Sequence, residues 1–285
     1  MSDQARDNTR QQKGRRYPPG YGIVEPVANY RPWDVDEEFA AVYELVREHT
    51  MVDVYRLWTL WFIARQIARA ETPGDVLEIG SWRGGSGTVI ARALASAAGP
   101  GAGGGTARPA TGNDAGAGTA GSATGNDAGA GDPSGGTPRR SVPRTVFLAD
   151  TFAGVVKASA RDTYYKGGEH ANTSADLVRA LLTRAAVTDV RLLAGVFPED
   201  RGAEIADRTF ALCHIDVDVY QSAKDCFEWV WPRMAPGGVV VFDDYGFYGC
   251  EGVTAYVNEL AAEPAVGSPV VPGLSGQAII TRAVY

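Results

Sequence analysis

The spacing of apolar residues along this chain changes from a helical to a strand-like period near residue 75. From Asp36 to Ile67 apolar side chains recur at helical spacing, which predicts two helices before the first strand. Residues 76–79 then form a short apolar run with one acidic residue, which predicts a strand, and residues 88–95 predict a helix. The chain therefore begins its ordered part with helices and continues with a strand, a turn and a helix.

The rest of the chain alternates apolar runs of strand length with amphipathic stretches of helix length. We expect strands at 145–149, 190–194, 210–215, 239–242 and 277–282, and helices at 174–185, 223–234 and 252–262. Pro236-Gly-Gly238 is expected to end the second of these helices. Regular alternation of this kind predicts an α/β fold, with a doubly wound and mostly parallel sheet covered by helices on both faces.

Two segments have a composition that does not favour a packed structure. Residues 1–35 are polar and interrupted by Pro and Gly, so we expect a flexible N-terminal arm. Residues 97–143 consist mostly of small and polar residues, and the nonamer ATGNDAGAG occurs twice, at 110–118 and 123–131. With almost no apolar side chains to bury, this stretch predicts a disordered insertion. We expect residues 36–285 to form one domain that this insertion interrupts.

Charge and cysteine content narrow the possible partners. The formal net charge of −7 and the absence of a long basic stripe argue against binding to nucleic acid. Cys213, Cys226 and Cys250 are too few and too scattered for a disulfide framework or a zinc site, which fits a reducing cytoplasm. No stretch reaches the roughly 20 apolar residues of a membrane span. We therefore expect a cytoplasmic location and a small molecule or a protein as partner.

The turn after the first predicted strand is typical of a cofactor site. Glu78 lies at the end of this strand, and Gly80, Gly84 and Gly85 follow it, so that the backbone can turn tightly beside a ligand. The first amides of the next helix could bind a cofactor carboxylate. The glycine spacing does not match the Gly-x-Gly-x-x-Gly pattern of dinucleotide sites. Because glycine-rich turns also follow strands without any ligand, this turn alone leaves both readings open.

Acidic residues follow several of the predicted strands, at the edge where ligands bind in such sheets. Asp150 could accept hydrogen bonds from both hydroxyls of a ribose, or it could cap a turn. Four further carboxylates come from two adjacent strand ends: Asp216, Asp218, Asp243 and Asp244. Clustered carboxylates repel one another unless a cation neutralises them, and Mg²⁺ with oxygen ligands would do so. Solvated loop acids are the alternative.

Two histidines near these acids differ in their expected roles. His214 alternates with the apolar residues of a predicted strand, so we expect a buried, hydrogen-bonded side chain and not a metal ligand. His170 and Glu169 lie in a loop before a helix that Thr173 or Ser174 would cap. Either loop residue could act as a base or line a substrate pocket. The three cysteines have no adjacent base and are interpreted as structural.

Four motifs together resemble the macrocin O-methyltransferase family. They are DVLEIGSWRGG at 75–85, LADTFAG at 148–154, HIDVDVYQS at 214–222 and GGVVVFDDYG at 237–246. Their order and spacing match from about Thr50 to the end of the chain, and the low-complexity insertion departs from the pattern. The resemblance implies a Rossmann-like class I methyltransferase fold with a seven-stranded sheet, the cofactors S-adenosylmethionine and Mg²⁺, and methyl transfer to a hydroxyl of a sugar on a natural product.

The resemblance also implies roles for individual residues. It assigns the cofactor to seven residues: Glu78, Gly80, Ser81, Gly84, Gly85, Ser86 and Asp150. It assigns the metal to Asp216, Asp243 and Asp244. A diol of the acceptor that chelates Mg²⁺ would become more acidic, and Asp216 or a loop residue such as His170 would take its proton. The acceptor itself stays open, as does a homo-oligomeric state.

Two other functions compete with this hypothesis. A nicotinamide-dependent oxidoreductase would also place Asp150 beyond a glycine turn. A non-catalytic small-molecule binding module would leave the acids solvated and use the insertion to recruit a partner. Binding of S-adenosylhomocysteine, NADH or neither separates the three.

We predict that deletion of residues 100–140 changes the free energy of unfolding by less than about 1 kcal/mol, because loop-closure entropy depends only weakly on loop length. Denaturant unfolding of the full chain and the deletion variant measures this difference. A large loss of melting temperature would contradict the prediction.

Overall fold

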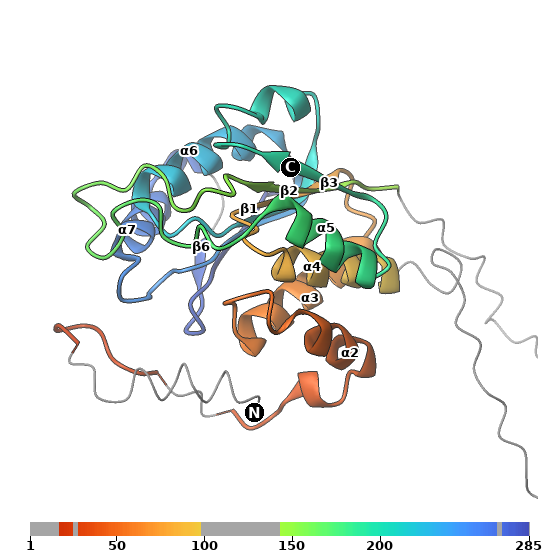
Figure 1. The fold of residues 1–285 in the computed structure, drawn as a ribbon. Helices are drawn as coiled ribbons and strands as arrows, with labels where there is room; N and C mark the ends of the chain where they lie inside the picture. Colours follow the sequence, from red (N-terminus) through yellow and green to blue (C-terminus); the bar gives the residue numbers. More distant parts are fainter. Residues whose placement is uncertain (1–16, 25–27, 98–142, 267–269, 285) are drawn as a thin grey trace, which may run out of the picture.

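The computed structural model describes residues 17–24, 28–97, 143–266 and 270–284 (Figure 1). Residues 98–142 of the predicted insertion lie outside these residues, as do residues 1–16 and 25–27 of the predicted arm. Among the residues that are described, no helix is long and apolar enough to cross a bilayer.

A seven-stranded sheet forms the centre of the structure and confirms the predicted fold class. Its strands are β1 (Asp75–Ile79), β2 (Val146–Asp150), β3 (Val190–Ala194), β4 (Phe210–Ile215), β5 (Met234–Phe242), β6 (Val270–Pro272) and β7 (Ala278–Thr281). They lie in the order β3-β2-β1-β4-β5-β7-β6. The first five strands pair in parallel, whereas β7 runs antiparallel to β5 and to β6. The strand order reverses at β1 and β4, where such sheets bind ligands.

Helices cover both faces of the sheet (Figure 1). One face carries α2 (Glu37–Val46), α3 (Val54–Arg69), α4 (Gly85–Ala97) and α5 (Ala175–Arg184), and the other carries α6 (Tyr220–Val230) and α7 (Glu251–Ala262). Short 3-10 helices are η1 (Pro32–Asp34), η2 (Gly202–Ile205), η3 (Trp231–Arg233) and η4 (Pro264–Val266). The two helices predicted before the first strand are thus α2 and α3.

Polar side chains fix where three of the helices begin. Asp36 accepts a hydrogen bond from the Phe39 amide at the start of α2, and Asp53 accepts bonds from the first amides of α3. Ser174 caps α5 by accepting a bond from the Leu177 amide, as one of the two predicted caps. Each cap satisfies amides that have no partner within the helix.

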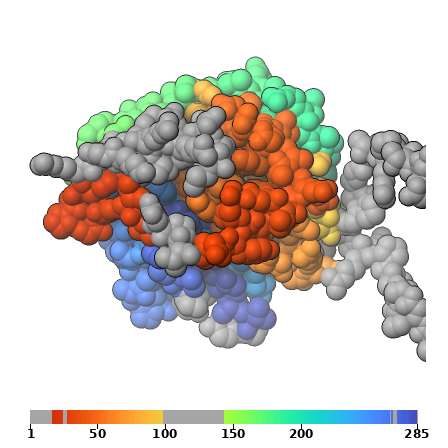
Figure 2. All heavy atoms as spheres, turned by 90° about the horizontal axis from the view of Figure 1, so that it is seen from below, coloured from red at the N-terminus to blue at the C-terminus, as the bar shows by residue number. Residues whose placement is uncertain are grey.

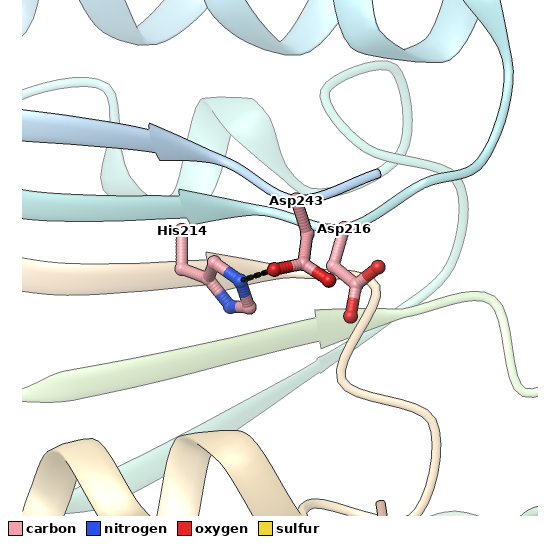
Figure 3. Close-up of side chains that lie close together, drawn as sticks. All are labelled: His214, Asp216 and Asp243. Atoms are coloured by element: carbon pink, nitrogen blue, oxygen red, sulfur yellow. Dashed lines mark hydrogen bonds and ion pairs between the residues drawn. The ribbon is translucent and has the colours of Figure 1, made fainter. Parts of the chain in front are cut away.

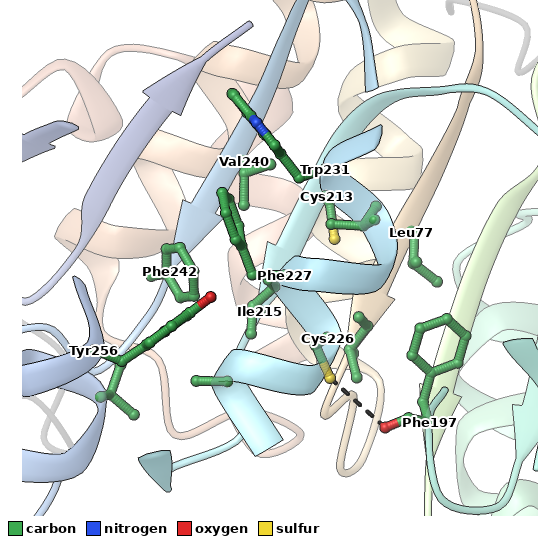
Figure 4. Packing of buried hydrophobic residues seen from close by; sticks show 14 of the residues in the cluster. Leu77, Phe197, Cys213, Ile215, Cys226, Phe227, Trp231, Val240, Phe242 and Tyr256 are labelled. Carbon is green, nitrogen blue, oxygen red and sulfur yellow. Dashed lines mark hydrogen bonds between the residues drawn. The ribbon is translucent and has the colours of Figure 1, made fainter. Parts of the chain in front are cut away.

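The alternation of side chains along the strands divides the core into two layers. Leu77 and Ile79 pack on the side of α6 and α7, where Phe227 stacks against Trp231 and lies beside Phe242 (Figure 4). Val76 packs on the opposite side, against α3 and α4. Glu78 alternates with Leu77 and Ile79, so its carboxylate also faces the α3 and α4 layer.

The starts of two predicted elements were wrong, and one strand was not predicted. Helix α4 begins at Gly85 and not at 88, because the small residues of its first turn let it approach the sheet: a Cβ atom on Gly87 would lie 2.5 Å from Glu78 Oε2. Strand β5 begins at Met234, so Pro236-Gly-Gly238 belongs to an irregular part of a strand and not to a turn. The short strand β6 has no apolar periodicity of its own and was not located.

Candidate functional site

A cavity opens at the carboxyl ends of β1, β2, β4 and β5. It is lined on one side by the turn after β1, on another by residues 49–52 before α3, and at its base by acids that follow β4 and β5. Because parallel strands end at the same edge of the sheet, segments that are far apart in the sequence meet here.

The turn after β1 approaches the backbone after β4 very closely. Gly80 has a φ of +91°, and a Cβ atom on it would lie 1.6 Å from the carbonyl oxygen of Asp216. No other residue fits this position without moving one of the two strands. Gly80 therefore brings the cofactor turn against the acids of β4.

Four of the seven predicted cofactor residues line the cavity: Gly80, Ser81, Ser86 and Asp150. The Ser81 hydroxyl is buried and has no hydrogen-bond partner within the described structure. A buried polar group without a partner is costly, so this hydroxyl fits a ligand that hydrogen-bonds to it. Ser86 lies in the first turn of α4, where free amides favour an anionic group.

Asp150 faces the cavity but also holds the local backbone. Its two carboxylate oxygens accept hydrogen bonds from the Trp82 amide at 2.7 Å and the Phe152 amide at 2.6 Å. Burial raises the pKa of Asp150, and these two bonds oppose the rise. Each carboxylate oxygen can accept a second bond, so the predicted turn cap and the predicted ribose contact are compatible.

The other three predicted cofactor residues lie behind the cavity wall. Glu78 is fully buried and its Oε1 is 2.9 Å from His214 Nδ1, whereas its Oε2 has no partner and faces Gly87. A Cβ atom on Gly84 would collide with Val178, and one on Gly85 would collide with the His49 carbonyl. These residues shape the turn and its packing, and their contact with a cofactor stays a prediction.

The four predicted acids converge at the base of the cavity. Asp216, Asp218, Asp243 and Asp244 all line it. Burial, and then the charges of the neighbouring carboxylates, raises the pKa of Asp216 well above its ordinary value and that of Asp244 to about 7. The structure thus brings together two pairs that are separated by 27 positions in the sequence, as predicted from the strand ends.

A buried arginine from α3 reaches these acids, and sequence reasoning missed it. Arg56 Nη1 forms an ion pair with Asp243 Oδ2, and its Nε donates to Asp53 Oδ2 at 2.9 Å. The signal was present: Arg56 precedes Leu60 by four positions and so lies on the buried face of a predicted helix. A charged residue at such a position indicates a buried partner.

His214 points at Asp243 from the adjacent strand, with Asp216 beside them (Figure 3). Its Nδ1 is bonded to Glu78, and its Nε2 lies 3.5 Å from Asp243 Oδ1. Burial alone would lower the pKa of His214, but the bonds to Asp243 and Glu78 raise it to about 9. The raised pKa favours the protonated ring, and both of its nitrogens are engaged. This arrangement supports the predicted structural role and leaves no nitrogen to bind a metal.

The donor set at the cavity base fits a hard divalent cation. Possible ligand atoms within 4.8 Å of one another form two groups, one of His214, Asp216 and Asp243 and one of Asp218, Asp244 and Cys250. Most of these ligand atoms are carboxylate oxygens. Asp244 Oδ2 is buried without a hydrogen-bond partner in the described structure. Oxygen ligands with unsatisfied lone pairs are what Mg²⁺ prefers. Because both His214 nitrogens are engaged, Asp216 and Asp244 are the better-placed ligands.

The loop that carries His170 closes another side of the cavity. His170 lines it with a φ of +63°, and its Nε2 lies 3.3 Å from the Tyr165 hydroxyl. Glu169 does not line the cavity; its carboxylate accepts bonds from the Lys166 and Gly167 amides and so fixes the loop. The three cysteines are buried and free, in agreement with the structural role predicted for them.

Several tyrosine rings lie near the loop that follows β5. Tyr17 and Tyr21 of the N-terminal segment contact Tyr248 edge-on, with ring centroids 5.7 and 5.6 Å away. Figure 2 shows this red segment beside the blue part of the chain. Tyr164, which is 60% exposed, packs on Tyr165. Of these rings Tyr165 lines the cavity, and Tyr164 lies beside Gly249, next to Tyr248.

Curated proteins similar to this chain are O-methyltransferases by name. The 8-demethyl-8-(2,3-dimethoxy-alpha-L-rhamnosyl)-tetracenomycin-C 4'-O-methyltransferase of Streptomyces olivaceus is 29% identical over 211 residues, which cover 71% of this chain and 64% of that protein. The mycinamicin III 3''-O-methyltransferase of Micromonospora griseorubida is 27% identical and is matched over 67% of its length. The chain thus spans about two thirds of the length of these relatives.

Solved structures show the same fold. The O-methyltransferase NovP has a TM-score of 0.58 and 21% identity, with 83% of each chain covered. The calicheamicin methyltransferase CalS11 has a TM-score of 0.53 and 15% identity, with 92% of this chain and 98% of that chain covered. At these identities the likeness concerns the fold alone.

A family model adds evidence that covers most of the chain. The model described as Macrocin-O-methyltransferase (TylF) matches residues 40–101 and 138–271. The matched ranges contain the turn after β1, the acids after β4 and β5, and Arg56. The unmatched stretch between them falls within the Gly- and Ala-rich segment. Since the match covers more than half of the sequence, the chain belongs to the macrocin-O-methyltransferase family.

Proposed function

We propose that this protein transfers the methyl group of S-adenosylmethionine to a hydroxyl of a glycosylated natural product, with Mg²⁺ at the acids. The observation that carries the proposal is the contact between the turn after β1 and the acids after β4, where Gly80 packs on the Asp216 backbone. A cofactor on this turn would lie beside a hydroxyl that the acids hold. Such proximity can supply much of the rate acceleration of a transfer reaction.

The cofactor would occupy the side of the cavity formed by β1, β2 and α4. Asp150 would accept hydrogen bonds from the ribose, and Ser81 would use the hydroxyl that has no other partner. The first amides of α4 beside Ser86 would hold the carboxylate of the methionine part. Residues 49–52 would close this side, where the His49 carbonyl accepts a bond from the Gly85 amide at 3.0 Å.

The cation would be held by the predicted ligands Asp216, Asp243 and Asp244. Bound there, Mg²⁺ would polarise an acceptor hydroxyl and lower its pKa. Asp244 supports this placement because one of its buried oxygens has no protein partner. Asp216 supports it because it lies between the cofactor turn and Asp243.

We propose Asp218 as the group that takes the acceptor proton. It lines the cavity at a φ of +66°, it has a carboxylate oxygen within 4.8 Å of a ligand atom of Asp244, and it is not one of the three predicted cation ligands. Of the predicted candidates, Asp216 would contact the cation, and His170 Nε2 contacts the Tyr165 hydroxyl, which also hydrogen-bonds to Asp218. Asp216, Asp218 and His170 all line the cavity. Substitution of each residue in turn would show which one takes the proton.

The acceptor would be a sugar attached to a larger apolar group. Both relatives described above are named for methyl transfer to glycosylated compounds. The sugar would reach the acids, and the attached group would lie on the aromatic rim formed by Tyr17, Tyr21, Tyr164 and Tyr248. Aromatic rims bind apolar groups and leave polar ends in contact with water.

We predict that S-adenosylhomocysteine binds the purified protein in calorimetry and that Asp150→Asn weakens binding by about tenfold or more, because a hydrogen bond to a charged group is lost. Asp176→Asn, on the exposed face of α5, is the matched control and should leave binding unchanged. Absence of binding at millimolar concentration would reject the proposed function. Fluorescence enhancement of NADH would instead favour an oxidoreductase.

Removal of divalent cations with EDTA should abolish methyl transfer, and Mg²⁺ should restore it, because the acceptor hydroxyl would lose its polarising cation. Asp244→Asn should raise the Mg²⁺ concentration needed for half-maximal activity by about tenfold or more. Glu263→Gln, at the exposed end of α7, serves as control. Full activity in EDTA would contradict the cation proposal and leave the cofactor proposal intact.

Asp218→Asn should lower kcat by about 10²- to 10⁴-fold with little change in the affinity for S-adenosylhomocysteine, as expected for loss of a general base. His170→Gln should lower kcat less. The reverse order of effects would assign the proton transfer to His170.

A further inference from the structure

Arg56 occupies an unusual position for a charged side chain. It lies in the first turn of α3, where a helix favours negative and not positive charge, and it is only 7% exposed. Burial would lower the pKa of Arg56, but Asp243 and Asp53 raise it, so the guanidinium is charged at any working pH. Such a group is retained inside a protein only if acids neutralise it.

Arg56 contacts one of the two carboxylate oxygens of Asp243. Arg56 Nη1 pairs with Oδ2 of Asp243, while Oδ1 accepts a bond from Gln277 Nε2 at 2.7 Å and faces His214 Nε2 at 3.5 Å. Both carboxylate oxygens are thus engaged by protein donors. By contrast, Asp244 keeps one buried oxygen without a partner.

The surroundings hold the guanidinium where it is. Its Nε donates to Asp53 at 2.9 Å, its Nη2 lies 3.4 Å from the Met51 carbonyl, and its carbon lies 4.7 Å from the centre of the Phe247 ring. It therefore cannot swing away from Asp243 without breaking contacts to two other segments. Asp243 Oδ2 therefore lies against a positive charge that its surroundings hold in place.

We propose that Arg56 is a built-in counter-cation that competes with the divalent cation for Asp243 and so sets the affinity of the acid site. Asp243 would attract a cation beside Asp216 and Asp244 only weakly, because the charge of Arg56 nearly cancels that of Asp243. Removal of the guanidinium frees Oδ2 and removes a repelling charge, while Gln277 and His214 still orient Asp243 through Oδ1. This inference rests on the proposed cation site and specifies how that site is tuned.

The test is the affinity of the full-length protein for Mg²⁺ or Mn²⁺ alone, measured by calorimetry without cofactor or acceptor. Arg56→Gln should bind the cation about tenfold more tightly than the unsubstituted protein, since like charges a few ångströms apart repel strongly in a partly desolvated site. Arg65→Gln is the matched control: Arg65 lies on the same helix and pairs with Asp36 at 2.8 Å, away from the cavity. It should leave the affinity unchanged.

Three further variants guard against misfolding of Arg56→Gln. Arg56→Lys keeps the charge and should bind the cation within about threefold of the unsubstituted protein. Asp243→Asn should weaken cation binding less than Asp244→Asn, because Asp243 is already neutralised. The double variant of Arg56→Gln with Asp243→Asn should return close to the original affinity.

The outcomes separate the two proposals. Equal or weaker cation binding by a folded Arg56→Gln, or a larger effect of Asp243→Asn than of Asp244→Asn, overturns the competition. No cation binding by any variant overturns the cation site itself and the competition with it, while S-adenosylhomocysteine binding still tests the methyltransferase proposal.

Discussion

The neutralisation of buried carboxylates at the strand ends is the constraint on which the site depends. Asp216 and Asp243 follow adjacent strands and are held together by the sheet, so their charges cannot move apart. Two protein cations, Arg56 and His214, meet Asp243 from α3 and from β4. No protein cation is in direct contact with Asp216 or Asp244 in the described structure, and burial and the neighbouring carboxylates raise their pKa values. A bound cation would stabilise their ionised forms.

Charged side chains on one face of the sheet connect the turn after β1 with the acids after β4 and β5. Glu78, His214 and Asp243 all face the α3 and α4 layer, because β1 pairs with β4 and β4 with β5 in matching register. The result is a row of alternating charges that runs from the cofactor turn to Arg56. Glu78 therefore acts on the site through its bond to His214. This contact explains why an acidic residue belongs in the cofactor motif although Glu78 does not line the cavity.

Membership of the macrocin-O-methyltransferase family favours methyl transfer as the proposed reaction. The geometry of the site indicates which residues would bind each reactant. The turn after β1 offers an unpaired hydroxyl and free helix amides, and the acids offer oxygens to a cation. The aromatic rim formed by the tyrosines would hold the apolar remainder of an acceptor. Each part would bind a different portion of the reactants, and the close packing of Gly80 on Asp216 sets the distance between them.

Sequence patterns predicted the order of the helices and of every strand except β6, the mostly parallel sheet and the edge at which the acids meet, because apolar periodicity and strand direction are local properties. Only the tertiary structure decided which face each charged side chain occupies and what neutralises it. Arg56 and Asp243 are 187 positions apart, and no local pattern pairs them. The start of α4 and of β5 likewise depended on close contacts with other segments, at Gly87 and after Met234, since tertiary packing overrides local turn preference where backbones approach.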